Sequence, residues 1–557
     1  MKEISDPGLS LLKDIIHSST PSQLNWIAGY IQGVLDSGAK PGPKNVSILY
    51  ATESGNSKKV ATELSALAKK LGSAVKLKNM ESYSLNELYA EDILFAIIST
   101  QGEGEPPSGA KSFFESLEKS PQKLQNLKYS ILALGDSSYP LFCKAGEDLD
   151  LFFFEKGGQR ILPIQKCDAD FKDEADIWFS NVLQFLKNEK GNTEFQARPK
   201  TEKTLKTKTP GRIKTHILLN DLGSLKKTYH VEIIPDGPLD YQPGDSISLI
   251  PENSPEWVSE ILELIPFPQN EKIRWKSEDW VIKEVLTHKA QIVYLPKRVV
   301  SYYSEKTNFD IPEIRIDLLD LLKIYPPPNL EVFKNLVENL DPISPRLYSI
   351  SSSPSAHGSD IHITVALDEF EYGGKKKYGH CSSFLSKKTV GETIDVLIHK
   401  NESFRLPSSD KDIIMIGPGT GIAPFRSFLF ERDATLAEGK NWLFFGDQYA
   451  QTDFLYQTEI QTFIASGLIN KISLAFSRDQ KEKHYVWHEM ERESVEFMQW
   501  LENGAYVYVC GSRDPMSLDV ERTILRIISK EKGFEEGIAK AYLEQLKEEG
   551  RYVKDVY

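Results

Sequence analysis

Cysteine is scarce in this chain of 557 residues, which contains four: Cys143, Cys167, Cys381 and Cys510. Four residues spaced this widely are too few for a disulfide framework, and none forms a CxxC pair of the kind that binds metals. The scarcity predicts a protein of a reducing compartment with no metal site.

Long hydrophobic runs are also missing. The N-terminal segment carries charged residues and Pro21 where a signal peptide would need an apolar stretch. No run approaches the ~20 apolar residues that a membrane-spanning helix requires. We therefore expect a cytoplasmic protein that is not attached to a membrane.

Positive charge is in deficit, because 67 Lys and Arg face 80 Asp and Glu and leave a net charge of −13. This balance argues against nucleic acid or an anionic membrane as the main partner, and it allows docking onto a basic protein. With 40% hydrophobic and 26% charged residues the composition is that of a folded protein. The length predicts three or more domains.

Apolar strands alternate with helical stretches in the first third of the chain. The runs Val46–Tyr50, Ile93–Ile98 and Tyr129–Leu134 are largely apolar, as strands of a parallel sheet are when both faces are buried. Each run ends in a loop rich in small and polar residues. In an open α/β sheet such loops bind the ligand.

The middle of the chain has a different pattern. Short strands with turn signals, such as Tyr229–Ile234 and Ile361–Leu367, predict an antiparallel β-barrel, and the proline-punctuated stretch between them predicts a helical insertion. A second α/β region begins near Lys411. The predicted domains are an N-terminal helical arm (1–45), a first α/β domain (46–187), a flexible linker (188–211), a barrel domain (212–407, insertion about 251–340) and a second α/β domain (408–557).

Residues 21–36 of the arm form an amphipathic pattern with Ser22 placed as a helix cap. Two interpretations stay open. The helix packs on its own chain, or it contacts a partner subunit and forms a homo-oligomer.

Three loops of the first domain suit a flavin phosphate and ring. Thr52–Ser57 lies between a strand and a helix, where small hydroxyls, Gly55 and free backbone N–H groups make a phosphate cradle. It lacks the Gly-Lys-Ser/Thr ending of an ATP-binding loop. Ser99–Gly104 and Leu134–Cys143 follow the next two strands, and Tyr139 is placed to stack on a ring. This domain resembles flavodoxin-type FMN domains.

Two segments of the barrel region suit a second flavin. In Arg346–Ser349 an arginine can pair with a pyrophosphate, Tyr348 can stack on a ring, and Ser349 offers a hydroxyl near a reacting atom. Gly379–Leu385 places small residues at a helix start. The pair is similar to the FAD site of the ferredoxin-reductase-like family. That resemblance also implies contacts by Thr364–Ala366 and Thr287.

A glycine-rich loop, Gly417–Gly421, follows a buried strand and opens a helix, the context expected of a dinucleotide site. After a later strand, Ser477, Arg478, Lys483 and Tyr485 offer two cations and two hydroxyls. Asp479 is also present. The set favours a 2′-phosphate, so NADPH is predicted over NADH.

Cys510 ends another buried strand, where a cysteine is usually inert packing. By resemblance to the same family it lies beside the nicotinamide, Asp519 contacts NADP, and Asp555 lies near the reacting groups. Tyr557 is either a frayed end or, by that resemblance, the aromatic that covers the FAD ring.

Together the motifs identify the chain as a member of the diflavin reductase family, with the resemblance running from about Pro21 to Tyr557. Within that family it most resembles the flavoprotein (alpha) components of NADPH-dependent assimilatory sulfite reductases. The similarity rests on Gln23–Tyr30, Ser99–Gly104, Asn441–Gly446, Ser477–Lys483 and Asp555–Tyr557. The implied fold is α/β multidomain, with a flavodoxin-like FMN domain, a ferredoxin-reductase-like antiparallel β-barrel for FAD and a Rossmann-like NADP-binding domain.

The resemblance implies that electrons pass from NADPH through FAD and FMN to a separate subunit, which contains sirohaem and an iron–sulfur centre and reduces sulfite to hydrogen sulfide. One alternative is a soluble NADPH–haemoprotein reductase that serves another haem or iron–sulfur acceptor. Another is a flavin-binding structural or sensing module without turnover. The acidic residues between Asp168 and Asp176 either guide docking of a basic acceptor or form a solvated helix start.

The resemblance assigns the site residues by cofactor. The catalytic residues are expected to be Ser349, Cys510 and Asp555. FMN contacts are expected from Thr52, Glu53, Ser54, Gly55, Asn56, Ser57, Ser99, Thr100, Gln101, Gly102, Leu134, Gly135, Asp136, Ser137, Ser138, Tyr139, Pro140, Leu141, Phe142 and Cys143. FAD contacts are expected from Thr287, Arg346, Leu347, Tyr348, Ser349, Thr364, Val365, Ala366, Gly379, His380, Cys381, Ser382 and Tyr557. NADPH contacts are expected from Gly419, Thr420, Ser477, Arg478, Lys483, His484, Tyr485, Val486, Trp487 and Asp519.

Overall fold

The computed structural model describes residue 20 and residues 45–53, 55–101, 104–135, 141–168, 171–187, 208–265, 271–276, 278–312, 316–372 and 375–557. The predicted helix of the N-terminal arm lies outside the described residues, as do most of the predicted linker and the predicted FMN contacts Ser54, Gly102 and 136–140. Those parts stay predictions. The described residues belong to two compact units, within 45–187 and 208–557.

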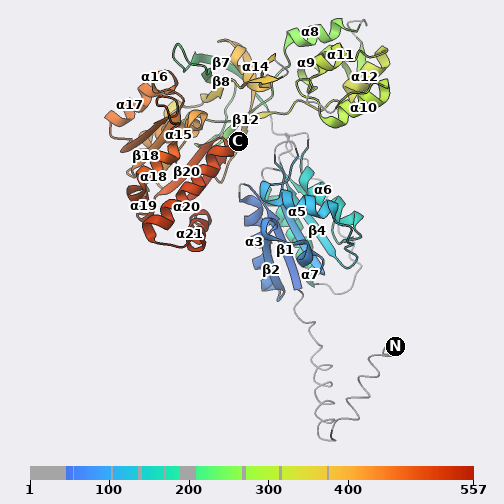
Figure 1. The fold of residues 1–557 in the computed structure, drawn as a ribbon, viewed down its shortest axis with the longest axis horizontal. Coiled ribbons are helices and arrows are strands. Elements are labelled where there is room, and N and C mark those ends of the chain that lie inside the picture. The colour runs from blue at the N-terminus through green and yellow to red at the C-terminus, as the bar shows by residue number, and fades with distance from the viewer. Residues whose placement is uncertain are drawn as a thin grey trace. The chain divides into compact units, whose positions relative to one another are not determined.

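The first unit is a parallel sheet covered by helices on both faces (Figure 1). Its strand order is β2-β1-β3-β4-β5, and β6 also pairs with β4. The strands are β1 (Asn45–Ala51), β2 (Ala74–Asn79), β3 (Ile93–Ser99), β4 (Lys128–Leu134), β5 (Gln159–Arg160) and β6 (Gln165–Cys167). The helices are α3 (Asn56–Lys70), the 3-10 helix η1 (Met80–Ser82), α4 (Leu85–Leu88), α5 (Ser108–Lys119), α6 (Lys144–Glu155) and α7 (Lys172–Lys187).

Both faces of this sheet are buried, which explains its uninterrupted apolar strands. Along β1, Ile48 belongs to a core cluster that includes Leu64 of α3 and Trp178 of α7. Its neighbour Leu49 points the other way, into a cluster with Phe113 of α5 and residues of α6. The predicted strands of this region are therefore confirmed as the centre of a three-layer α/β unit.

The second unit begins with an antiparallel sheet in the order β12-β9-β16-β7-β8-β13. A bridge between Ile350 and Ile363 joins its two ends, so the sheet closes as a barrel around an aliphatic core. The strands are β7 (Thr209–Leu218), β8 (Thr228–Pro235), β9 (Ser246–Leu249), β12 (Arg346–Ser349), β13 (Ile361–Ala366) and β16 (Thr393–His399). Beside it lie α13 (Pro354–His357), α14 (His380–Lys387) and the hairpin β14 (Glu369–Tyr372) with β15 (Lys375–Tyr378).

The insertion between β9 and β12 gathers its helices around a core of its own (Figure 1). Side chains of Ser254, Asp317 and Asn329 cap three of these helices by accepting backbone N–H groups. The elements are α8 (Pro255–Glu263), β10 (Lys272–Trp275), β11 (Glu278–Val281), α9 (Ile282–His288), α10 (Lys297–Thr307), α11 (Leu318–Ile324) and α12 (Leu330–Glu338). The small hairpin β10–β11 was not predicted.

A second parallel sheet follows, in the order β19-β18-β17-β20-β21. Helices α15 and α17 pack on one face, and α18 to α21 pack on the other. The strands are β17 (Ile413–Ile416), β18 (Asn441–Asp447), β19 (Lys471–Phe476), β20 (Tyr506–Gly511) and β21 (Tyr552–Val556). The helices are η2 (Gly419–Gly421), α15 (Ile422–Ala434), α16 (Ala450–Asp453), α17 (Gln457–Ala465), α18 (Val486–Arg492), α19 (Ser494–Glu502), the π-type turn η3 (Arg513–Ser517), α20 (Leu518–Lys532) and α21 (Glu536–Glu548).

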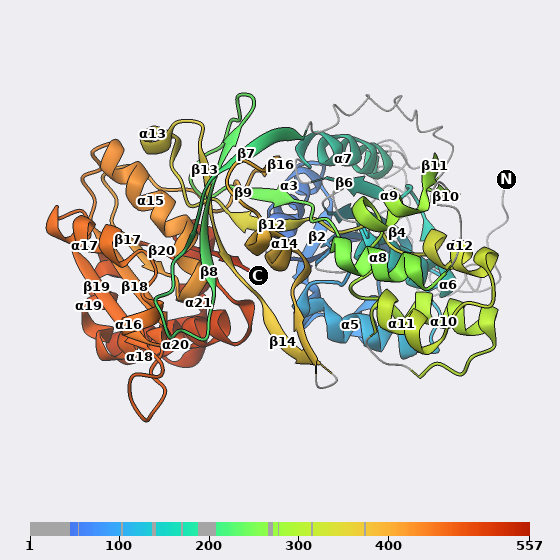
Figure 2. The same cartoon turned by 90° about the horizontal axis from the view of Figure 1, so that it is seen from above.

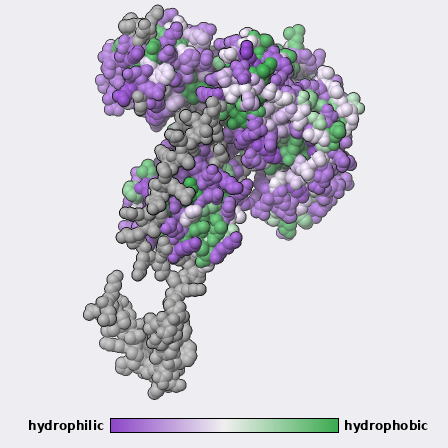
Figure 3. Space-filling view, turned by 180° about the vertical axis from the view of Figure 1, so that it is seen from behind, coloured by the Kyte–Doolittle hydropathy of each residue, from purple (hydrophilic) through white to green (hydrophobic). Residues whose placement is uncertain are grey.

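The sheets confirm the predicted α/β multidomain class. The division of the second unit into a barrel domain and a second α/β domain at residue 408 stays a prediction, because its parts share one compact unit. Among the described residues no helix combines the length and the apolar character needed to cross a membrane. The visible surface is largely hydrophilic with scattered apolar residues (Figure 3).

Candidate functional site

The described residues at the starts of the three predicted FMN loops lie at one edge of the first sheet, because β1, β3 and β4 are parallel neighbours. Gly55 precedes α3 with φ 87°, a left-handed conformation that suits glycine, and its N–H donates to Thr52 Oγ1 at 2.9 Å. The buried hydroxyls of Ser57 and Ser99 have no hydrogen-bond partner among the described residues. Buried hydroxyls are normally paired, so an oxygen-rich ligand such as a flavin phosphate fits this edge.

Other predicted FMN residues use their side chains within the fold. Glu53 accepts the N–H of Ser108 at 2.6 Å, at the start of α5. The Cys143 thiol donates to Ala133 O at 3.2 Å, and burial raises the pKa of Cys143 to about 12. The Thr100 hydroxyl accepts the N–H of Ala145 at 3.2 Å. These three residues can contact a ligand through their backbone, while their side chains hold the loops in place.

The predicted FAD segments meet beside the barrel. The Tyr348 side chain is hydrogen-bonded to Cys381 at the start of α14, and burial raises the pKa of Cys381 to about 12. A Cβ on Gly379 would lie 2.8 Å from Ser382 Oγ and 2.9 Å from the Asp368 side chain. The turn therefore requires glycine. It exposes helix N–H groups to an anion, which fits the pyrophosphate of FAD.

A cavity of about 580 Å³ adjoins this turn and was missed by the sequence analysis. Aromatic side chains line it, among them Trp257, Phe370 and Tyr378, and His380 of the predicted FAD segment shares its wall. Burial lowers the pKa of His380 to about 4, so the imidazole is neutral at physiological pH. The aromatic residues lie in two distant parts of the sequence, which hid their convergence.

Thr287 and Thr364, the remaining predicted FAD contacts with hydroxyls, are engaged elsewhere. Thr287 lies in α9, and its hydroxyl donates to Lys283 O at 2.8 Å within that helix. Its carbonyl accepts the N–H of Asn253, a residue of the cavity wall. Thr364 Oγ1 lies 2.7 Å from the Tyr456 hydroxyl, and Val365 points into the barrel core. Both hydroxyls are thus committed to internal contacts.

The dinucleotide loop is built on close backbone approaches. A Cβ on Gly421 would lie 2.2 Å from the carbonyl oxygen of Cys510, and one on Gly417 would lie 2.5 Å from Gly421 O. Only glycine fits either position. The loop leads from β17 through η2 into α15, as predicted. This is a cradle with room for a pyrophosphate and none for side chains.

The three residues predicted to be catalytic lie next to one another. Strands β20 and β21 are parallel and place Cys510 opposite Asp555. Ser349 Oγ, at the end of β12, donates to Asp555 Oδ2 at 2.7 Å and also bonds the Cys510 thiol. Burial raises the pKa of Cys510 well above its usual range, which keeps the thiol protonated.

Burial also raises the pKa of Asp555, while the hydrogen bond from Ser349 and the charge of His399 act to lower it. Residues from the barrel and from the second parallel sheet thereby form one polar cluster. Tyr557, which follows β21, extends it. Its hydroxyl lies 2.7 Å from Thr420 Oγ1 of the dinucleotide loop, and its side chain is 62% exposed.

The predicted 2′-phosphate residues follow β19. Arg478 and Lys483 are exposed, and neither forms an ion pair with another residue in the described ranges. Asp479, the acidic residue that would compete with a phosphate, accepts the N–H of Ala450 at 3.1 Å at the start of α16. That bond turns the carboxylate of Asp479 toward α16, and the loop keeps a net positive charge because Arg478, Lys481 and Lys483 outnumber Asp479 and Glu482.

The other residues predicted to contact NADPH fall into two groups. Tyr485 stacks on Trp487 with ring centroids 4.4 Å apart, which leaves a flat surface near the loop. Val486 is buried in the core, His484 pairs with Glu489 at 2.6 Å, and Asp519 pairs with Arg522 at 3.3 Å. Those three side chains serve the fold.

Lys226, in the connection between β7 and β8, is a residue that the sequence analysis missed. Its Nζ bonds both oxygens of the buried Asp447, at 2.6 and 2.8 Å. The same atom lies 3.8 Å from where a Cβ on Gly419 would be. Asp447 Oδ2 lies at the same distance, so the barrel brings one half of an ion pair to the dinucleotide loop across 193 sequence positions, a separation that no local pattern reveals.

Three family models match the chain in succession. The model described as Flavodoxin covers residues 48–178, the FAD binding domain covers 310–384, and the Oxidoreductase NAD-binding domain covers 415–522. With the geometry above, this order defines a diflavin oxidoreductase, a class in which two flavin domains and a nicotinamide-nucleotide domain share one polypeptide.

Similarity to curated proteins extends over the full length. The chain is 36% identical to the sulfite reductase [NADPH] flavoprotein alpha-component of Bacillus subtilis, over 98% of this chain and 97% of that protein. It is 34% identical to the proteins of the same name from Shewanella oneidensis, over 100% and 98%, and Vibrio cholerae, over 100% and 96%. The chain belongs to the family of sulfite reductase [NADPH] flavoprotein alpha-components.

Proposed function

We propose that this protein is the NADPH-oxidising electron donor of a sulfite reductase, and that it passes electrons to a separate haem-containing subunit. The observation that carries the proposal is the bond from Ser349 Oγ to Asp555 Oδ2 at 2.7 Å. This bond joins β12, which carries predicted FAD residues, to β21, where Asp555 lies opposite Cys510 of β20. Both β20 and β21 belong to the sheet that carries the dinucleotide loop. A reaction between a nicotinamide and a flavin needs such a junction.

Bound flavins supply chemistry that side chains lack, because they accept a hydride and release electrons one at a time. The protein's residues do the rest. Gly417–Gly421 admits the NADPH pyrophosphate, with Lys226 as a nearby cation. Ionised Asp555 would stabilise the positive charge that grows on a nicotinamide as it gives up hydride, and the bond from Ser349 favours that ionised form. The protonated thiol of Cys510 belongs to the same cluster, to which it contributes a neutral, buried side chain.

The two flavins have separate places. Ser57 and Ser99 would hold FMN at the edge of the first sheet, and Gly379–Ser382 with Arg346 would hold the FAD pyrophosphate. The aromatic cavity next to His380 suits the adenosine part of FAD. The carboxylate of Asp479, turned toward α16, and the exposed Arg478 and Lys483 favour NADPH over NADH.

All four cysteines are free thiols in this structure, which agrees with a cytoplasmic location. Cys143 lies next to Cys167, with its Sγ 3.7 Å from Cys167 O, and both are buried. Sulfite chemistry is assigned to the separate haem-containing subunit.

The deciding experiment uses the purified chain reconstituted with FMN and FAD. Anaerobic NADPH should bleach the flavin absorbance, and NADH should do so much more slowly. Adding the haem-containing sulfite reductase subunit should then make NADPH oxidation depend on sulfite. Bleaching without sulfite turnover would indicate another haem or iron–sulfur acceptor. Absence of bleaching would leave a flavin-binding module without turnover.

A further inference from the structure

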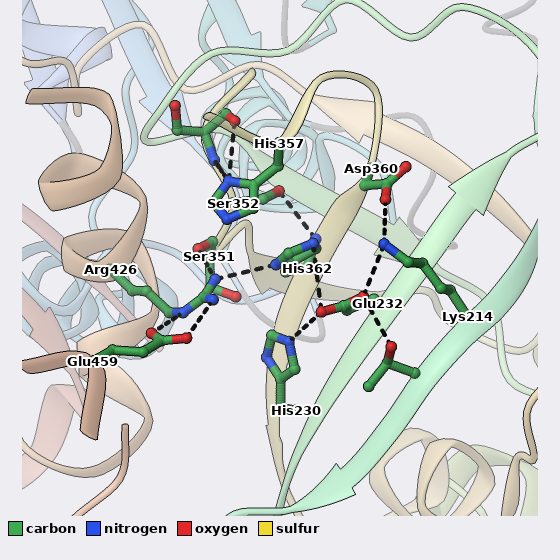
Figure 4. A network of polar contacts seen from close by, with 12 residues as sticks. Lys214, His230, Glu232, Ser351, Ser352, His357, Asp360, His362, Arg426 and Glu459 are labelled. Carbon is green, nitrogen blue, oxygen red and sulfur yellow. Dashed lines mark hydrogen bonds and ion pairs between the residues drawn. The ribbon is translucent and has the colours of Figure 1, made fainter. Parts of the chain in front are cut away.

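A buried polar network joins the barrel to helices α15 and α17 (Figure 4). At its centre is Arg426 of α15, whose side chain is 6% exposed. Its Nε and one terminal nitrogen bond both oxygens of Glu459, at 2.7 and 2.8 Å. The other terminal nitrogen reaches into the barrel, where it donates to Ser351 O at 2.8 Å and to His362 Nδ1 at 3.1 Å.

Part of this network has the composition of a metal site. Nitrogen and oxygen atoms of His230, Glu232 and His362 lie within 4.8 Å of one another. Arginine, however, can only donate hydrogen bonds, so Nδ1 of His362 must accept from Arg426. The ring proton of neutral His362 is then on Nε2, which faces Glu232 at 3.9 Å. A protonated nitrogen has no lone pair for a metal, so we interpret the cluster as a buried network of hydrogen bonds and charges, in which His362 Nε2 faces the Glu232 carboxylate without bonding it.

His362 is held neutral, as this network requires. Burial lowers its pKa most, and the charge of Arg426 and the neighbouring His357 and His230 lower it further, against the opposing effect of Glu232. His230 continues the network, with Nδ1 3.0 Å from the Tyr456 hydroxyl. The bond from Arg426 to His362 therefore connects α15 to the barrel, and the contact of His230 with Tyr456 connects the barrel to the start of α17. Glu232 pairs with His230 inside the barrel.

Helix α15 makes further contacts with the same segment of the barrel. Ser427 Oγ donates to Ser352 O at 2.5 Å. Glu431 accepts the hydroxyls of Ser353 and Ser355, at 2.6 and 2.8 Å. Helix α13, which contains Ser355, lies against α15 (Figure 2). Successive turns of one helix thus hold the segment from Ser351 to Ser355.

The contact between α15 and the segment Ser351–Ser355 matters because of what lies at the end of each. Ser351 comes two residues after Ser349, the hydroxyl of the proposed reaction site. Helix α15 begins directly after the dinucleotide loop Gly417–Gly421. A rigid helix and a short stretch of backbone therefore connect Arg426 to both sides of the place where nicotinamide and flavin would meet.

We propose that Arg426 is a positioning residue that sets the separation between Ser349 and the dinucleotide loop, and with it the approach of nicotinamide to flavin. The inference deepens the proposed function and rests on it. Misplacement by about 1 Å can slow a transfer step about 100-fold. The planar, rigid guanidinium group of Arg426 suits this task, because it bonds Glu459, Ser351 and His362 at once.

Arg432 provides a matched control on the same helix. It is 2% exposed, and its terminal nitrogen donates to Lys411 O at 3.0 Å and Gly439 O at 2.5 Å. These acceptors flank β17 and β18, on the same side of the junction as the helix itself. Arg432→Gln removes a buried guanidinium, as Arg426→Gln does, without cutting a bond to Ser351–Ser355.

The first test needs no cofactor. Hydrogen exchange of the full chain without flavins, followed by mass spectrometry, should show exchange in residues 350–356 about tenfold faster in Arg426→Gln than in the unsubstituted protein. Arg432→Gln should accelerate exchange near Lys411 and Gly439 and leave 350–356 unchanged. Unchanged exchange of 350–356 in Arg426→Gln, or equal acceleration there by both variants, overturns the proposal.

The second test measures flavin reduction by NADPH in rapid mixing, after reconstitution. We expect the limiting rate to fall about 10- to 100-fold in Arg426→Gln, with NADPH affinity within about threefold and Arg432→Gln within about twofold of the unsubstituted rate. Glu459→Gln keeps the arginine but loses one partner, and it should slow the step about threefold. That residue is 35% exposed, so this variant decides the question if Arg426→Gln retains no FAD.

The positioning role is overturned if flavin reduction in Arg426→Gln is as fast as in the unsubstituted protein. If Arg426→Gln retains no FAD, an unchanged rate in Glu459→Gln overturns it instead. An equal loss of rate in Arg432→Gln also overturns it. Failure of the unsubstituted protein to be reduced by NADPH refutes the proposed function instead. The two failures are therefore distinguishable.

Discussion

The chain contains two parallel α/β sheets that place ligand loops at the same edge, the carboxyl ends of their strands, and they complete those loops differently. In the first unit the loops belong to β1, β3 and β4 of one sheet, and two buried hydroxyls, Ser57 and Ser99, lack partners among the described residues. In the second, the loop Gly417–Gly421 packs directly against the backbone of β20, and the ion pair of Lys226 of the barrel with Asp447 lies beside it.

The difference separates two ways of preparing a site. The first sheet leaves polar groups unpaired, and a ligand would satisfy them. The second unit also has buried polar atoms without partners among the described residues, but at its proposed reaction site the polar groups are paired across the junction with the barrel, through contacts such as Ser349 to Asp555 and Arg426 to Ser351. Substitutions in the first site should therefore act on ligand affinity, and substitutions in the second should act on geometry.

The largest effect is expected from Gly421→Ala. Its Cβ would lie 2.2 Å from Cys510 O, so the loop and β20 must separate, at a cost of about 3 kcal/mol of stability in the second unit. NADPH-dependent flavin reduction should fall at least about 100-fold. Gly55→Ala in the first unit meets no atom within 4 Å and should cost about 1 kcal/mol through its positive φ alone. Equal losses, measured by denaturant unfolding of each unit, would remove the contrast.

Ser349→Ala should slow flavin reduction by NADPH about 10- to 100-fold without changing the FMN content. The hydrogen bond from Ser349 lowers the pKa of Asp555, so its loss should raise that pKa. If ionised Asp555 is the active form, the rate falls as pH falls through this pKa. The acidic limb of the pH profile should therefore move to higher pH. Ser386→Ala is the control, because that hydroxyl donates to Ser383 O within α14. An unmoved limb would contradict the role given to Asp555.

The substitution Ser57→Ala tests the same comparison in the first unit. We expect FMN to bind about tenfold more weakly, because one hydrogen bond to a charged group is lost. The FMN-free unit should be as stable as before or more stable, because an unpaired buried hydroxyl has gone. Fluorescence titration with FMN and thermal unfolding without it check the two statements. A variant that is destabilised while free of FMN would mean that the hydroxyl already has a partner.

The smallest effect is a difference in acid sensitivity. Residues 45–187 contain no histidine, whereas burial lowers the pKa of His230 and His362 in the second unit. The groups that face them include Arg426, Glu232 and His357. A folded-state pKa below the unfolded value of 6.5 gives stability that is present above pH 6.5 and is lost as the pH falls.

At pH 5 the loss is about 2 kcal/mol for His362, whose pKa of about 2 lies below that pH, and the lowered pKa of His230 acts in the same direction. Calorimetry at pH 7.5 and pH 5 should show the unfolding transition of the second unit falling by about 5 °C more than that of the first. Equal shifts would show that the histidines titrate normally. His362→Asn, which keeps an acceptor for Arg426, should reduce the difference.

Local patterns were sufficient wherever function depends on neighbours in sequence. The dinucleotide loop was predictable because a buried strand, closely spaced glycines and a helix start lie within a dozen residues of Ile413. The first sheet was predictable because burial on both faces makes its strands apolar. The order of the three loop types indicated the cofactors, and the family matches agree with it.

Contacts made only by folding could not be read in this way. Tyr552–Val556 has no strong strand pattern and becomes β21 only because β20 offers an open edge. Lys226 reaches the dinucleotide loop from the barrel, and His362 meets Arg426 across 64 positions. Among the serines that follow Ser349, the sequence gives no sign of which lie against α15. The predicted contacts of Thr364 and Val486 stay predictions, and their side chains also make internal contacts that the sequence did not indicate.

The bond between Asp479 and the N–H of Ala450 has a practical consequence for redesign of the coenzyme preference. If Arg478 and Lys483 bind the 2′-phosphate as proposed, removing them would take away that attraction without adding a group that binds a ribose hydroxyl, because the Asp479 carboxylate already accepts the N–H of Ala450 at the start of α16. A variant that uses NADH therefore needs a new acidic side chain after β19 as well as the loss of the two cations.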